Sequence, residues 1–78
     1  MNITYVLISC EVGTEKSVLA KLKSLESVKE ISHLFGSYDI IVKLEAASAE
    51  KLKEIVLSKI RNLKKIRTTV TLSVKETL

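Results

Sequence analysis

The chain has 78 residues, enough for one domain, and its 46% hydrophobic and 28% charged residues are typical of a folded globule. A domain this small buries only about 60–65% of its unfolded surface, and metals, disulfides or oligomers usually make up the shortfall. Cys10 is the only cysteine and His33 the only histidine, which excludes an internal disulfide and a Cys/His metal cluster. We therefore expect an oligomer that needs no metal or other cofactor.

The net charge of +4 raises the question of an anionic partner. The basic residues of the second half are interleaved with Glu50 and Glu54 at helical and loop spacing, which favours a solvated helix face over a nucleic-acid patch. The longest apolar run is far shorter than the roughly 20 residues of a membrane span, and no secretion signal is recognisable. We expect a cytoplasmic protein that contacts no membrane.

Two strand–helix–strand units follow one another along the chain. Residues 3–10 are rich in β-branched and aromatic types and are apolar on both alternations, which indicates a strand covered on both faces. Gly13 permits a turn, Thr14 is the predicted N-cap, and an apolar stripe at helical spacing predicts a helix that ends near Leu25. Residues 28–34 have the mixed polarity of an edge strand.

The second unit begins after a tight connection at residues 35–37. Residues 38–44 are again apolar on both alternations at their centre and predict a strand antiparallel to the preceding one. Ser48 is the predicted cap of a second helix. Its buried stripe is expected to contain Leu52, Ile55, Val56, Ile60 and Leu63.

The last predicted strand, residues 66–74, has the clearest period-two alternation in the chain. One face is expected to carry Ile66, Thr68, Val70, Leu72 and Val74. The other face is expected to carry Arg67, Thr69, Thr71, Ser73 and Lys75.

The resulting βαββαβ order predicts an α+β, ferredoxin-like fold, in which both helices lie on one face of a four-stranded antiparallel sheet. The expected strand order is 4-1-3-2, so the two strands that are apolar on both faces are central. The helices leave the other face of the sheet open. A second copy packed sheet to sheet is the simplest cover for it.

Few residues carry recognisable chemistry. No nucleophile–base pair stands out, and no phosphate-binding loop is possible with Gly13 and Gly36 as the only glycines. Asp39 opens an otherwise apolar central strand, where a carboxylate needs donors. It can accept hydrogen bonds from turn amides, or one from the ammonium of a ligand. Thr69 and Thr71 share a strand face, where they are either ordinary strand residues or hydroxyl donors to a small polar ligand.

Three segments, YVLISCEVG, HLFGSYDIIVKLEA and IRTTVTLSV, resemble the regulation-of-amino-acid-metabolism (RAM) domain of the Lrp/AsnC transcription regulators over about residues 3–75. The resemblance implies sheet-to-sheet homodimers that assemble into rings, often octamers, with amino-acid effectors bound where dimers meet. Its G-x-Y-D and T-x-T motifs give the candidate ligand-binding residues Gly36, Tyr38, Asp39, Thr69 and Thr71. Asp39 is expected to meet the effector's ammonium, and backbone N–H groups of residues 35–37 its carboxylate.

The family's regulators place a helix-turn-helix domain before this one, for which 78 residues leave no room. We therefore expect residues 1–78 to be a single stand-alone ligand-binding and oligomerisation domain. Such a domain has no direct specific DNA binding of its own and modulates full-length Lrp/AsnC-type regulators. One alternative is a small dimeric enzyme of monooxygenase or isomerase type, for which His33 and Tyr38 are the candidate residues. The other is a purely structural assembly subunit.

Overall fold

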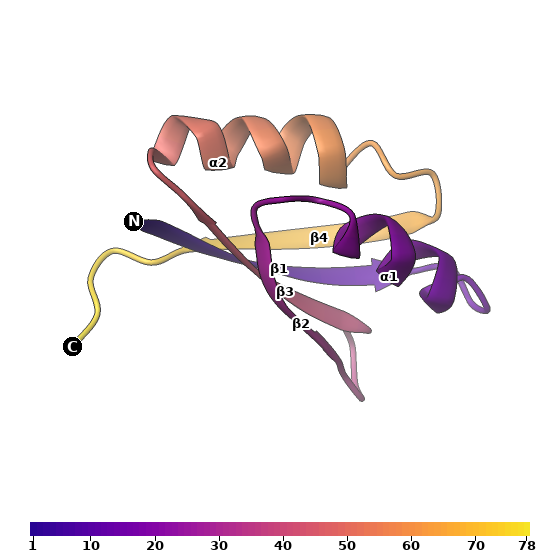
Figure 1. The fold of residues 1–78 in the computed structure, drawn as a ribbon. Coiled ribbons are helices and arrows are strands. Elements are labelled where there is room, and N and C mark those ends of the chain that lie inside the picture. Colours follow the sequence, from indigo (N-terminus) through magenta and orange to yellow (C-terminus); the bar gives the residue numbers. More distant parts are fainter.

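A computed structural model describes all 78 residues and shows a four-stranded sheet with two helical segments (Figure 1). The strands lie in the order β2-β3-β1-β4, and all neighbouring strands are antiparallel. The predicted ferredoxin-like fold and strand order are therefore confirmed. In chain order the elements are β1 (Asn2–Cys10), α1 (Glu15–Lys23), β2 (Val28–His33), β3 (Ile40–Ala46), α2 (Ala49–Ile55), η1 (Val56–Ile60) and β4 (Ile66–Ser73).

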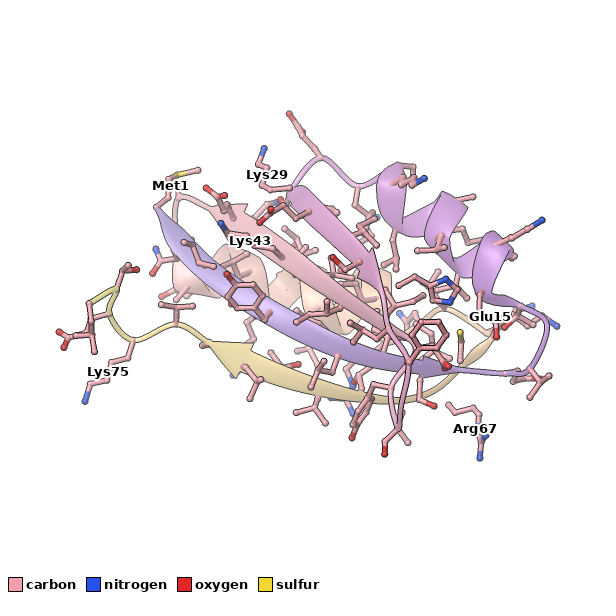
Figure 2. All side chains as sticks on the ribbon, turned by 90° about the horizontal axis from the view of Figure 1, so that it is seen from below. Met1, Glu15, Lys29, Lys43, Arg67 and Lys75 are labelled. Carbon is pink, nitrogen blue, oxygen red and sulfur yellow. The ribbon has the colours of Figure 1, made fainter.

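Both helical segments lie on one face of the sheet (Figure 1), and the central strands bury alternate side chains beneath them. Val6 and Ile8 of β1 and Ile40 and Val42 of β3 are completely inaccessible to solvent. The residues between them are half-buried and belong to the opposite face, which no other element covers (Figure 2). The two strands that are apolar on both alternations thus occupy the centre of the sheet, as predicted.

The apolar stripes of the helices complete the core. Their buried residues are Val18, Leu22, Leu52, Ile55, Val56 and Ile60. Leu25 and Leu63 were predicted at the ends of these stripes. They follow the last helical residues and pack half-buried against the core from outside. Neither helix has the length and apolar character of a membrane span.

The two helix N-termini are capped differently. The Ser48 hydroxyl accepts the N–H of Lys51 at 3.1 Å, so this cap is confirmed. Thr14 occupies the N-cap position of α1, but its hydroxyl makes no cap hydrogen bond and instead donates to the carbonyl of Glu11 at 2.6 Å. The predicted side-chain capping role of Thr14 is therefore wrong, because the preceding turn uses its hydroxyl.

The second helix is not a continuous α-helix. After Ile55 it widens into the π-helical turn η1, in which the N–H of Arg61 donates to the carbonyl of Val56, five residues earlier. In an unbroken α-helix, Ile60 would lie seven residues, or about two turns, after the exposed Lys53 and four residues after the buried Val56, at the edge of the buried stripe. The extra residue of the wider turn brings Ile60 into line with Leu52 instead, where it is fully buried.

Two strand boundaries differ from the prediction. β3 begins at Ile40 rather than Tyr38, because the chain is still turning through Asp39 and the β2–β3 connection is correspondingly longer. In β4 the register shifts by one residue, since Ser9 pairs with Thr68 but Cys10 pairs with Ile66. This bulge places Ile66 on the helix side, against the core, and not on the face of Thr68 as predicted.

Candidate functional site

The β2–β3 connection presents unused backbone donors. The N–H of Leu34 donates to the carbonyl of Asp39 at 2.7 Å and closes the loop, while Gly36 adopts φ +126°, a conformation that favours glycine. Within the chain, the N–H groups of residues 35–38 donate no hydrogen bond. The Phe35 side chain at the tip is fully exposed. The loop therefore offers four consecutive donors and one apolar side chain.

Asp39 lies against the end of β1. Its Oδ2 accepts the N–H of Cys10 at 2.8 Å and is 3.7 Å from the Cys10 Sγ, while its own N–H donates to the carbonyl of Ile8 at 2.8 Å. The donor that satisfies this carboxylate is thus a strand-end amide of β1 and not a turn amide. Its second oxygen, Oδ1, has no hydrogen-bond partner within the chain.

Cys10 is a buried, small apolar residue with 4% of its surface exposed. Burial, and then the charge of the neighbouring Asp39 carboxylate, raise the pKa of the Cys10 thiol above its ordinary value. The thiol therefore stays protonated at neutral pH and serves packing, not nucleophilic chemistry.

The two threonines lie on the opposite side of β1 from Asp39. Ile8 pairs with Ile40 on one side and with Thr69 on the other, and Val6 pairs with Thr71. Adjacent strands are about 4.8 Å apart, so roughly 10 Å separates the backbones of β3 and β4. Thr69 and Thr71 share the helix-facing side of β4. The structure therefore groups Gly36, Tyr38 and Asp39 in one loop but does not bring either threonine to that loop within one chain.

His33 and Tyr38, the residues of the enzyme alternative, flank the same connection. His33 is exposed at the end of the edge strand β2, and Tyr38 is half-buried. Neither side chain makes a hydrogen bond. No acid–base pair is assembled here.

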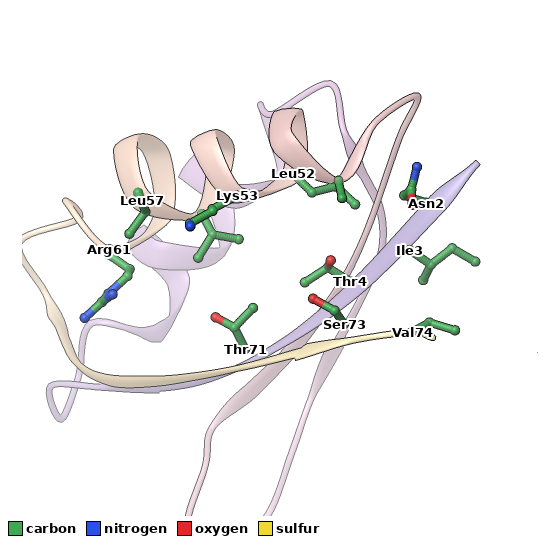
Figure 3. Close-up of a pocket in the computed structure, with 12 residues that line it drawn as sticks. Asn2, Ile3, Thr4, Leu52, Lys53, Leu57, Arg61, Thr71, Ser73 and Val74 are labelled. Carbon is green, nitrogen blue, oxygen red and sulfur yellow. The ribbon is translucent and has the colours of Figure 1, made fainter. Parts of the chain in front are cut away.

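A hollow that the sequence did not reveal lies between the second helix and strands β1 and β4 (Figure 3). Its volume is about 410 Å³. Leu52 faces it from the helix, Thr4 and Thr71 face it from the sheet, and Arg61 lies at the end of η1. Val56 also lines it. Lys53, Leu57 and Arg61 are spaced four residues apart, which was visible in the sequence, but the π-turn that follows Ile55 was not.

The fold is that of a small α+β domain of the ferredoxin-like class. The family model of the Lrp/AsnC ligand-binding domain matches residues 3–78. The chain belongs to the Lrp/AsnC ligand-binding domain family, which confirms the resemblance drawn from its three sequence segments.

The chain spans less than half the length of the regulators that it matches in sequence. A helix-turn-helix-type transcriptional regulator of Pyrococcus furiosus is 36% identical over 59 residues, and the regulatory protein AsnC of Escherichia coli is 38% identical over 58 residues. These matches cover 76% and 74% of the chain but only 39% and 38% of the two regulators. A homocitrate synthase of Saccharolobus islandicus is 40% identical over 55 residues, which is 70% of the chain and 12% of that enzyme.

Solved structures give the same result for the fold. The crystal structure of FFRP-DM1 superposes with a TM-score of 0.91 at 32% identity, covering 95% of the chain and 99% of that structure. The structure of E. coli AsnC superposes with a TM-score of 0.90 at 30% identity, covering 97% of the chain but 52% of that protein. The chain thus matches nearly the whole of one solved chain and about half of another.

Proposed function

We propose that residues 1–78 form a single amino-acid-sensing and oligomerisation domain whose effector binds at the β2–β3 connection. The observation that carries this proposal is that one connection contains both a free carboxylate oxygen, Asp39 Oδ1, and free backbone N–H groups around Gly36. An α-amino acid presents an ammonium and a carboxylate a short distance apart. It therefore needs an acceptor and several donors close together, and the connection supplies both.

The two halves of the effector have different partners. Asp39 Oδ1 accepts a charge-assisted hydrogen bond from the ammonium, while Oδ2 keeps its bond to Cys10. The N–H groups of Phe35, Gly36 and Ser37 receive the carboxylate, because Gly36 lets the backbone approach closely. The half-buried Tyr38 forms the adjoining wall of the site.

Assembly completes the site in this proposal. Tyr5, Leu7 and Ile41 leave an apolar band on the open sheet face, and a second copy packed against it forms the homodimer. The fully exposed Phe35 and the effector loop then meet a neighbouring dimer in an octamer-like ring. That neighbour supplies the hydroxyl of Thr69 or Thr71, which explains why one chain does not bring them to Asp39.

Such a domain regulates other proteins and does not bind specific DNA itself, since no recognition helix is present among these residues. Its proposed partners are full-length Lrp/AsnC-type regulators in the cytoplasm. A second candidate role follows from the match to a segment of homocitrate synthase, namely effector control of a biosynthetic enzyme. In both roles the chain binds a ligand and is not itself an enzyme.

Calorimetric titration with each of the twenty amino acids tests the proposal. We expect one or a few to bind, and the 2-oxo acid and the amine analogue of the best ligand to bind at least about tenfold more weakly, because each lacks one of the two recognised groups. Equal affinity for the 2-oxo acid contradicts the assignment of Asp39. Failure of every amino acid to bind favours the purely structural assembly subunit, and turnover abolished by His33→Ala favours the enzyme.

A further inference from the structure

Within one chain, the hollow beneath the second helix lies on the other side of β1 from the β2–β3 connection, and Thr71 is the only lining residue that is also a candidate for the effector site. Its volume of about 410 Å³ is within the roughly 300–1,000 Å³ range of small-molecule sites. Leu52 and Val56 are buried on the helix side, and Leu57 and Val74 remain 47% and 36% exposed at its edge. An apolar ligand body entering the hollow would cover these exposed side chains.

The charges around the hollow are all positive. Lys53 and Arg61 are the only charged residues that line it, and neither forms an ion pair within the chain. Arg61 extends from the end of η1 toward β4 (Figure 3), and Thr71 of β4 lines the same hollow. A carboxylate at this end of the hollow can accept hydrogen bonds from the guanidinium and from the Thr71 hydroxyl.

The π-turn contributes to this arrangement. In an unbroken helix Ile60 would lie at the edge of the buried stripe, and Arg61, eight residues after Lys53, would lie farther around the helix from the hollow. With the π-turn, Ile60 is buried in the core and Arg61 lies beside the hollow. Turns of this kind within helices are frequent at functional sites.

The floor of the hollow contains an unused hydroxyl. Thr4 is the one polar residue among the buried residues, at 3% exposure, and its hydroxyl makes no hydrogen bond within the chain. No enclosed side-chain oxygen or nitrogen lacks a partner, so the Thr4 oxygen must open into the hollow. No acidic side chain lines the hollow, so no charged acceptor is present for an ammonium.

We propose that this hollow is a second binding site, specific for an aliphatic carboxylate that has no amino group. The carboxylate lies between Arg61, Lys53 and Thr71, and the hydrocarbon chain extends along Leu52 and Val56 toward Ile3 and Val74. The same domain then binds two classes of ligand, one at the β2–β3 connection and one in this hollow.

Methyl-group NMR with octanoate as the probe tests this site on the whole chain. We expect saturable shifts of the Leu52, Val56 and Leu57 methyl signals, and at least about fivefold weaker binding of octylammonium, which has the same hydrocarbon chain and the opposite charge. Equal binding of both probes, or shifts confined to Leu7 and Ile41 on the open sheet face, would overturn the proposal.

Charge-removing variants locate the carboxylate. Arg61→Gln and Lys53→Gln should each weaken octanoate binding by about threefold, and the double variant by about tenfold, because both cations are solvent-exposed. Lys59→Gln removes the same charge from the same helix but lies outside the hollow and should change nothing. Equal weakening in all three single variants would mean diffuse attraction to a basic surface, and the site would be rejected.

NMR spectra of the same samples distinguish binding in the hollow from binding at the proposed effector site. The Gly36 amide signal reports an amino acid in the β2–β3 connection, whereas the Leu52 and Val56 methyl signals report octanoate. Octanoate shifts without any amino-acid response support the hollow and reject the effector proposal. An amino-acid response without octanoate shifts does the reverse.

Discussion

The carboxylate of Asp39 and the backbone of Cys10 are joined by a hydrogen bond of 2.8 Å, which ties the start of β3 to the end of β1. The residue that the family resemblance assigns to the effector therefore also has a structural partner. The two roles are compatible because they use different oxygens: Oδ2 holds Cys10, and Oδ1 is free. Substitutions at this position can separate them.

Asp39→Asn should leave the fold nearly unchanged, since the amide oxygen can still accept the N–H of Cys10, and should weaken amino-acid binding by about 1.5–3 kcal/mol. Asp39→Ala removes the acceptor and should also lower the free energy of unfolding by about 1–3 kcal/mol, because the Cys10 N–H loses its partner. Urea unfolding and calorimetric titration measure the two effects. If Asn destabilises the fold as much as Ala does, Asp39 acts only as a structural residue.

Cys10 is expected to resist alkylation while the chain is folded. Iodoacetamide at mildly alkaline pH should modify it about tenfold or more slowly than in denaturant, because only the thiolate reacts and the folded state disfavours it. Mass spectrometry after timed quenching gives both rates. Rapid alkylation of the native chain would contradict the burial of this thiol beside Asp39.

The raised pKa of the Cys10 thiol also makes the stability of the fold depend on pH. The folded state holds the Cys10 proton more tightly than the unfolded state, whose thiol ionises near its ordinary value of 9.0. The resulting stabilisation is fully present below that value and is lost as the pH rises through the higher folded pKa. Cys10→Ala should remove the part of the alkaline loss of stability that is due to this thiol and leave the part that is due to other groups.

The fold was predictable because local patterns and topology agree at the central strands. Strands near residues 3–10 and 38–44 are apolar on both alternations, and only the centre of a half-covered sheet accounts for that. Two features that the sequence did not reveal are insertions of a single residue. The bulge at Arg67 and the π-turn before Arg61 each change which face the following residues occupy, and neither alters the apolar spacing enough to be seen in the sequence.

The candidate site was predictable in part. The G-x-Y-D motif located the β2–β3 connection, since Gly36 indeed has a positive φ and Asp39 lies beside the central strand. The Cys10 amide as partner of Asp39 could not be foreseen, because it comes from a segment 29 residues away. The hollow was missed for a related reason, since its walls come from β1, the second helix and β4.

Deleting one residue from the π-turn should have little effect on stability, unlike a deletion in a regular helix. Removing Lys59, an exposed residue within the turn, should convert η1 to an ordinary α-helical turn while Ile60 keeps its buried position. The free energy of unfolding should then change by less than about 1 kcal/mol, measured by urea unfolding. Deleting the exposed Ala20 from the regular helix α1 is the control and should shift the buried face of that helix out of register. A loss of several kcal/mol on deleting Lys59 would show that the turn is not a single-residue insertion.

The open sheet face should be the homodimer interface. Ile41 pairs with Leu7 on this face, whereas the neighbouring Ile40 is fully buried beneath the helices. Ile41→Lys places an unpaired charge in the proposed apolar contact and should weaken the dimer by about 3–5 kcal/mol while leaving each chain folded.

Sedimentation velocity over a range of concentrations, together with circular dichroism, measures both properties. Val12→Lys is the matched control, because Val12 is 92% exposed in the β1–α1 turn and the same change there should leave the dimer intact. Lys43, half-buried on the open face and 3.6 Å from Glu30, shows that a charge is accommodated there when a partner is at hand. No such acid pairs with position 41, whose strand neighbours are Leu7 and Ser32. A wild-type chain that sediments as a monomer at micromolar concentration, or an Ile41→Lys variant that remains fully dimeric, would place the interface elsewhere.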